Sequence, residues 1–110
     1  MLPLTSGQIW LYAAVTDMRK QFDGLVSLVQ SQLGMRAQLG DWFVFVNRKR
    51  TQIKVLYYHQ GGYCLWSKRL ERGTFAKVAG KAPKVPLNGT QLQCLIAGIN
   101  WQQMPQKKRL

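Results

Sequence analysis

Residues 42–70 read WFVFVNRKRTQIKVLYYHQGGYCLWSKRL, which is three apolar and aromatic runs separated by two short polar connections. The runs at 42–47, 52–58 and 63–70 have the length and the composition of β-strands. The connections at 48–51 and 59–62 have hairpin length, and the second contains Gly61-Gly62, which is typical of a tight turn. The stretch therefore predicts an antiparallel β-meander.

An amphipathic helix is predicted before this meander, over residues 17–33. Thr16 is the expected N-cap, and Gly34 ends the pattern. A first strand is expected at 9–15, where the residues are bulky and uncharged. The stripe that would face the sheet recurs at steps of three and four residues and consists of Met18, Phe22, Leu25, Val29 and Leu33.

A second helix is predicted after the meander, over residues 89–99. Asn88 and Gln91 have the spacing of a capping box, in which the two side chains satisfy each other's backbone N–H groups. Leu87 and Leu92 occupy the two positions of a hydrophobic staple. The helical stripe continues from Leu92 through Leu95, Ile96 and Ile99, with Gly98 near the end.

These elements predict an α+β fold with a central antiparallel meander of three to four strands, flanked by two main helices. A single domain is expected over residues 1–101, followed by a basic tail at 102–110. Residues 80–86 contain two prolines and a glycine, so a loop is expected there. Trp101 is expected to pack back onto the domain.

The chain is strongly and unevenly basic. Its 110 residues contain 16 Lys and Arg against 4 Asp and Glu, which gives a net charge of +12. Residues 1–47 are neutral overall, whereas residues 48–84 contain ten basic residues against Glu71 alone. This distribution favours a polyanion as the partner. The predicted nucleic-acid-binding residues are Arg48, Lys49, Arg50, Lys54, Lys68, Arg69 and Arg72, with Arg19 and Lys20 as secondary basic positions.

The acidic residues do not form a pattern for metal-dependent catalysis, which requires carboxylates clustered around cations about 4 Å apart. Asp17 is explained by the helix N-terminus, and Asp23 by an ion pair with Arg19 four residues earlier. Asp41 is explained by a turn, and Glu71 by its basic neighbours. We therefore predict no catalytic residue, no metal site and no cofactor.

The two cysteines and the N-terminus indicate a soluble cytoplasmic protein. Cys64 and Cys94 are isolated, without the spacing of a zinc site, and are expected to be reduced and buried. Residues 1–15 lack the charged region of a signal peptide. No apolar run approaches about 18 residues, so no membrane span is predicted.

Two interpretations of individual residues remain open. The aromatic residues of the meander either stack on bases or form the strand core. His59, the only histidine, is either a turn residue or a general base beside Lys54, Tyr57 and Arg69 in a small metal-independent ribonuclease. The aromatic residues concerned are Trp42, Phe43, Phe45, Tyr57, Tyr58, Tyr63 and Trp66.

Four motifs occur in order along the chain. They are V-T-D-M-R-K-x-F-D-G-L (15–25), F-V-F-x-N-R-x-R (43–50), K-R-L-E-R-G-x-F (68–75) and Q-L-x-x-L-x-x-G-I-x-W (91–101). Over residues 8–101 the chain resembles the TnpB-type accessory proteins of bacterial insertion sequences, which are encoded beside a larger DDE transposase. Two departures from the family pattern are His59, where an acidic residue is usual, and Thr74, where Arg is common.

The resemblance implies a role that assists transposition, with catalysis left to the partner transposase. The residues favour a polyanion as the partner, and together with the resemblance they give the leading hypothesis of a non-enzymatic accessory factor that binds DNA, the transposase or both. The DNA is expected to be insertion-sequence ends or DNA without sequence preference. A pure protein adaptor without nucleic-acid contact is the remaining alternative. The sequence does not indicate the oligomeric state.

Overall fold

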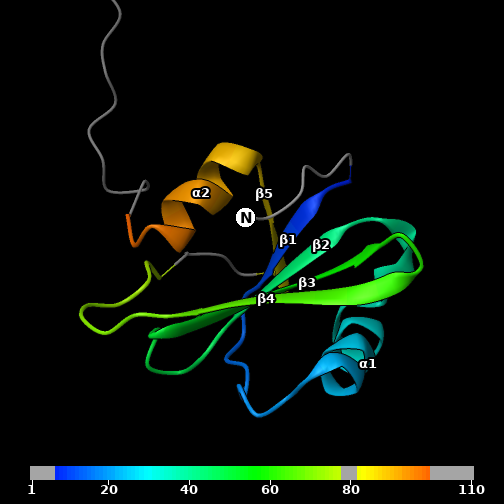
Figure 1. Cartoon of the computed structure of the whole chain (residues 1–110), viewed down its shortest axis with the longest axis horizontal. Coiled ribbons are helices and arrows are strands. Elements are labelled where there is room, and N and C mark those ends of the chain that lie inside the picture. Colours follow the sequence, from blue (N-terminus) through cyan, green and yellow to red (C-terminus); the bar gives the residue numbers. More distant parts are fainter. Residues whose placement is uncertain (1–6, 78–81, 100–110) are drawn as a thin grey trace, which may run out of the picture.

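In the computed structural model, which describes residues 7–77 and 82–99, a five-stranded sheet lies between two helices (Figure 1). The α+β fold class is confirmed. The strands are β1 (Ile9–Tyr12), β2 (Trp42–Val46), β3 (Gln52–His59), β4 (Gly62–Arg69) and β5 (Lys84–Leu87). The helices are α1 (Phe22–Leu33) and α2 (Gly89–Ile96), with a short 3-10 helix, η1 (Ala37–Leu39), before β2.

The order of strands across the sheet is β4-β3-β2-β1-β5. The predicted antiparallel meander is confirmed for β2, β3 and β4, in which Val55 lies opposite both Val44 and Trp66. β1 runs parallel to β2, with Ile9 opposite Trp42, so the whole sheet is mixed. A parallel neighbour requires a long crossover connection, and α1 lies within it.

The edge strand β5 corrects the prediction of a loop over residues 80–86. β5 pairs antiparallel with β1, with Leu87 opposite Ile9 and Val85 opposite Leu11. Pro86 is tolerated because an edge strand has one side on which a missing N–H breaks no ladder bond. Residues 80 and 81 lie outside the described part of the chain.

Helix α1 begins at residue 22, five residues later than predicted, with Gln21 as its N-cap. The cause is a side chain that lies far away in the sequence. The Lys54 ammonium donates hydrogen bonds to the Met18 carbonyl at 2.8 Å and to the Lys20 carbonyl at 2.9 Å. These carbonyls are therefore committed to Lys54, and residues 17–20 form a turn.

The polar contacts of this turn also differ from the prediction. Arg19 forms its ion pair with Asp17 at 2.7 Å, not with Asp23. The Arg19 backbone N–H donates to the same Asp17 carboxylate, which closes the turn locally. Thr16, the predicted N-cap, is buried, and its Oγ1 has no hydrogen-bond partner within the described residues.

Helix α2 confirms the predicted capping box. The Asn88 side chain accepts from the Gln91 N–H at 2.8 Å, and the Gln91 side chain accepts from the Asn88 N–H at 2.9 Å. The helix ends at Ile96, earlier than predicted, and Gly98 has a φ of 80°. The first strand also ends earlier, at Tyr12 rather than at residue 15.

The sheet separates two hydrophobic cores, one under each helix, because successive residues of a strand point to opposite faces. The α2-side core consists of Ile9, Leu11, Trp42, Val44, Ile53, Val55, Phe75, Leu87, Leu92 and Leu95. The α1-side core consists of Leu25, Val29, Leu33, Ala37, Phe43, Phe45 and Leu56. Phe22, which was predicted to join the second core, is 43% exposed.

Three further observations complete the fold. Cys64 and Cys94 are free, and both are half-buried rather than fully buried. Among the described residues, no helix is long and apolar enough to cross a membrane. Trp101 and the basic tail at 102–110 lie outside the described residues.

Candidate nucleic-acid interface

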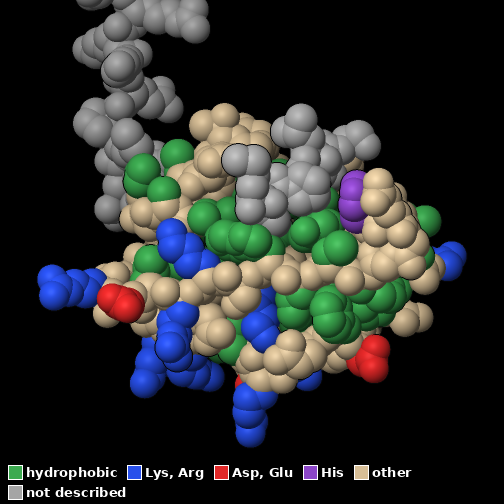
Figure 2. All heavy atoms as spheres, in the orientation of Figure 1, with side chains coloured by type: hydrophobic (Ala, Val, Ile, Leu, Met, Phe, Trp, Pro, Cys, Tyr) green, Lys and Arg blue, Asp and Glu red, His purple; other side chains and the backbone are tan. Residues whose placement is uncertain are grey.

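Four exposed cationic side chains meet at one end of the sheet, which we call the basic end. Two lie on the β2–β3 connection, and two lie at or just after the end of β4. The two segments are neighbours, because the Leu70 N–H donates to the Thr51 carbonyl at 2.8 Å. In Figure 2, Lys and Arg side chains gather at the left and lower left, where Figure 1 places this end. The four residues are Arg48, Lys49, Arg69 and Arg72.

The β2–β3 connection is held in one conformation by Asn47. Its side-chain oxygen accepts from the N–H groups of Thr51 and Gln52, at 2.9 and 3.0 Å. Its backbone carbonyl accepts from the N–H of Arg50, which adopts a left-handed φ of 55°. Arg48 and Lys49 are therefore presented on a structured turn. This role of Asn47 was not predicted from the sequence, although Asn is typical of such turns.

Arg50 is half-buried and ties the segment after β4 to the β2–β3 connection. Its Nε donates to the Phe75 carbonyl at 3.2 Å, and its own carbonyl accepts from the Phe75 N–H at 2.7 Å. Phe75 is fully buried in the α2-side core. Arg50 thus has a structural role in holding the two segments together.

Two of the predicted phosphate contacts are engaged inside the protein. Lys54 is only 4% exposed, with its ammonium on the carbonyls before α1. Lys68 donates to the Ile96 carbonyl at 2.9 Å, where a positive charge complements the carbonyl end of α2. Neither position suits direct contact with a phosphate.

The secondary positions Arg19 and Lys20 are both exposed on the turn before α1. Hydrogen bonds from Arg19 lower the pKa of Asp17 to about 2, and the carboxylate in turn raises the pKa of Arg19. The Asp17 carboxylate is therefore charged at neutral pH and offsets the charge of Arg19. Of Arg19 and Lys20, Lys20 is therefore the more available for contact with a phosphate.

A groove of about 240 Å³ opens beside the basic end, where the parallel strands β1 and β2 finish. It is lined by residues 11–15, by residues 46–48 with Arg50, and by Ala76 with Lys77. Lys77 is exposed and was not among the predicted site residues. Its place within the basic stretch 48–84 is the signal that identifies it.

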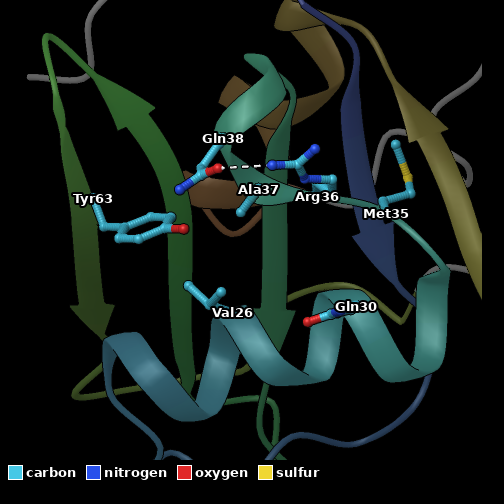
Figure 3. Close-up of a pocket in the computed structure, with 7 residues that line it drawn as sticks. All are labelled: Val26, Gln30, Met35, Arg36, Ala37, Gln38 and Tyr63. Carbon is cyan, nitrogen blue, oxygen red and sulfur yellow. Dashed lines mark hydrogen bonds between the residues drawn. The ribbon is translucent and has the colours of Figure 1, made fainter.

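A pocket of about 290 Å³ lies toward the opposite end of the sheet, between α1, η1 and β4 (Figure 3). Arg36 is the one cation among its lining residues, and its guanidinium donates to the Gln38 side chain at 3.3 Å. The remaining lining residues are Val26, Gln30, Met35, Ala37 and Tyr63. With one cation among its lining residues, this pocket does not have the several exposed cations of the basic end.

The residues of the ribonuclease alternative are not brought together. Lys54 and Tyr57 point to opposite faces of β3. His59 lies opposite Gly62 and Arg69 opposite Gln52, so seven residue steps, about 23 Å, separate them along the hairpin. Burial raises the pKa of Tyr57, with a contribution from Cys64, and its ring stacks on Trp42 at 4.9 Å.

The acidic residues do not form a cluster, and Asp17 and Asp41 each have their own local partners. Asp41 joins the start of β2 to β1, because its carboxylate accepts from the Gln8 N–H and from the Trp10 indole, both at 3.0 Å. Glu71 is exposed in the segment after β4. Within residues 7–77 and 82–99, no group of three or more His, Cys, Asp or Glu side chains is placed to hold a metal ion.

Three of the seven aromatic residues belong to the cores, and three more pack against them. Trp42, Phe43 and Phe45 are buried. Tyr58 and Tyr63 face each other edge to face at 5.1 Å and are half-buried, as is Trp66. The structure therefore favours the core interpretation for the buried three.

Comparison with known proteins places the chain in a family. A family model described as IS66 Orf2 like protein matches residues 7–106. The chain is 36% identical over 105 residues to uncharacterized protein y4hO of Sinorhizobium fredii, covering 93% of this chain and 90% of that protein. It is 31% identical over 91 residues to y4jC of the same organism, covering 83% and 78%. No solved structure gives a significant match.

Proposed function

This chain belongs to the IS66 Orf2-like family of insertion-sequence accessory proteins, and we propose that it assists transposition by binding DNA through its basic end. The resemblance derived from the four sequence motifs is thereby confirmed. The observation that carries the DNA-binding proposal is the meeting of Arg48, Lys49, Arg69 and Arg72 at one end of the sheet, on two segments joined by backbone hydrogen bonds.

The chemistry of this end suits the DNA backbone. Each exposed Lys or Arg that neutralises a phosphate releases condensed counterions, which favours binding at low salt without reading the sequence. Glu71 is the single acidic residue on the two segments, so little internal charge competes with a phosphate. The shape of the segments is fixed by Asn47 and Arg50, which reduces the entropy lost on binding.

Catalysis is assigned to a partner transposase. The four acidic side chains of this chain each serve a local contact or stand alone, and the ribonuclease residues are separated. The pure protein is expected to leave DNA uncut in the presence of Mg²⁺ or Mn²⁺. Cleavage that disappears on Asp41→Asn or Glu71→Gln would contradict this assignment.

A matched pair of variants tests the basic end. Arg48→Ser removes one guanidinium group from the basic end, whereas Arg36→Ser removes one guanidinium group from the pocket at the opposite end of the sheet. DNA affinity is measured by fluorescence anisotropy as a function of salt. We expect Arg48→Ser to reduce the slope of log K against log salt by roughly 0.9, the value of one phosphate contact on duplex DNA. The slope for Arg36→Ser should equal that of the unmodified protein.

Equal reductions of the slope in the two variants would show that total charge, rather than the basic end, controls binding, and an unchanged slope in both would show that Arg48 does not contact phosphate. A pull-down with the neighbouring transposase, with and without terminal-repeat DNA, tests the protein partner. If Arg48→Ser loses the transposase while its DNA affinity and salt slope are unchanged, the basic end is a protein-docking site and the adaptor function replaces DNA binding.

A further inference from the structure

We infer that the groove beside the basic end accepts one unpaired nucleotide of DNA, so that the protein prefers a DNA end or gap over a continuous duplex. This inference rests on the proposed DNA-binding function and specifies the form of DNA. It is drawn from the lining of the groove, its size and its position relative to Arg48 and Lys49.

The lining of the groove combines an apolar wall with a cationic rim. Ala13, Ala14 and Val15 form one wall, and Val15 is 52% exposed although it is a large apolar side chain. Arg48 and Lys77 lie on the rim and are exposed. A nucleotide has the same combination, because an apolar base face is joined to a charged phosphate.

The size of the groove limits its occupant to a small group such as one base. Its volume of about 240 Å³ lies below the roughly 300–1,000 Å³ that is typical of sites for drug-sized ligands. A duplex presents its base faces to neighbouring bases and only its phosphates to a protein outside the grooves. Only an unstacked base can bring its face to the alanine and valine wall.

The position of the groove links it to the duplex contacts. It opens where β1 and β2, the parallel pair, both end. Arg48 belongs both to the groove and to the basic end. A duplex that is held by Lys49, Arg69 and Arg72 and ends at Arg48 would have its terminal nucleotide next to the groove.

Three DNA probes of one sequence test the inference with the full chain: a blunt duplex, the duplex with a three-thymine overhang, and the duplex with an abasic overhang of equal length. Anisotropy titrations should show the thymine overhang binding at least about fivefold tighter than the blunt duplex. The abasic overhang, which keeps the phosphates but not the bases, should bind within about twofold of the blunt duplex.

Two variants locate the effect. Ala14→Leu fills the groove without changing charge, and Ala97→Leu makes the same change on the exposed end of α2. Ala14→Leu should abolish the preference for the thymine overhang and retain blunt-duplex affinity, and Ala97→Leu should retain both. Val15→Ser, at an exposed position, provides a second groove variant should Ala14→Leu fail to fold.

The outcomes separate this inference from the proposed function. Equal affinity for the blunt and thymine-overhang probes overturns the inference and leaves DNA binding by the basic end intact. Equal affinity for the abasic and thymine overhangs also overturns it, because the phosphates alone then account for the gain. Failure to bind any of the probes overturns the proposed function and the inference with it.

Discussion

Lys54 and Lys49 carry the same charge five residues apart, and their environments are opposite. Lys49 is exposed at the tip of the β2–β3 connection. Lys54 is 4% exposed, and its ammonium is bound to the carbonyls of Met18 and Lys20. The first is available to a phosphate, whereas the second fixes the turn before α1. Charge in the sequence therefore does not by itself identify a binding residue.

Replacing Lys54 by Met should reduce the free energy of unfolding. The variant keeps the apolar stem and removes the donor, so the two carbonyls lose their partner, at a cost of about 1–3 kcal/mol. Chemical denaturation measures the change, with Lys49→Met as the control, which should stay within about 0.5 kcal/mol. DNA affinity should fall for Lys49→Met and be unchanged for folded Lys54→Met. Equal stability of the two variants would refute the structural role of Lys54.

At the scale of elements, the sequence predicted what local signals determine. The hairpins joining β2, β3 and β4 follow from strand-forming runs at hairpin spacing, and the capping box follows from Asn88 and Gln91. The predicted start of α1 and the predicted loop at the position of β5 were wrong, because both segments depend on residues that are distant in the sequence. The local sequence of residues 17–20 predicts a helix, but in the structure Lys54 binds the carbonyls of Met18 and Lys20 and these residues form a turn. Residues 84–87 form a strand because they pair with β1.

The cap of α2 gives a prediction for an element. Asn88→Ala removes the side-chain acceptor for the Gln91 N–H and should cost about 0.5–2 kcal/mol of unfolding free energy. Because Leu92 and Leu95 of α2 are buried in the core, the loss should appear in the global transition followed by thermal or chemical denaturation. Gln93→Ala, an exposed position within the same helix, should cost nothing measurable. A cost for Gln93→Ala equal to that for Asn88→Ala would exclude the cap as the cause.

For the candidate site too, the sequence predicts what depends on local composition and not what depends on tertiary contacts. The runs of basic residues predicted the binding positions, and the structure places four of them, Arg48, Lys49, Arg69 and Arg72, exposed at the basic end. Burial and partners, which decide the cases of Lys54 and Lys68, depend on tertiary packing. The groove, with Lys77 on its rim, is built from three segments that are distant in the sequence, so no local pattern reveals it.

At the scale of the whole molecule, and among the residues that the structure describes, the exposed cations Arg48, Lys49, Arg69 and Arg72 lie at one end of the sheet, whereas the pocket beside Tyr63 has Arg36 as the one cation among its lining residues. DNA bound at the basic end should therefore slow backbone amide exchange at residues 47–51 and 69–76. Exchange at residues 26–38, around the opposite pocket, should not change. Hydrogen exchange with mass spectrometry, with and without duplex DNA, measures both regions in one experiment. Protection confined to residues 26–38 would place the DNA at the wrong end for our proposal.

The position of β1 between β2 and β5 has a consequence for how the chain folds. One neighbour of β1 comes from the middle of the chain and the other from close to its C-terminal end, so the sheet combines local hairpins with two long-range pairings. Long-range pairings are slow because a large loop must close before they form. During synthesis, β2, β3 and β4 can assemble as they emerge, whereas β1 keeps an open edge until residues 84–87 leave the ribosome. The nascent chain therefore has an unpaired, apolar strand edge, the kind of feature that chaperones protect, until β5 closes the sheet.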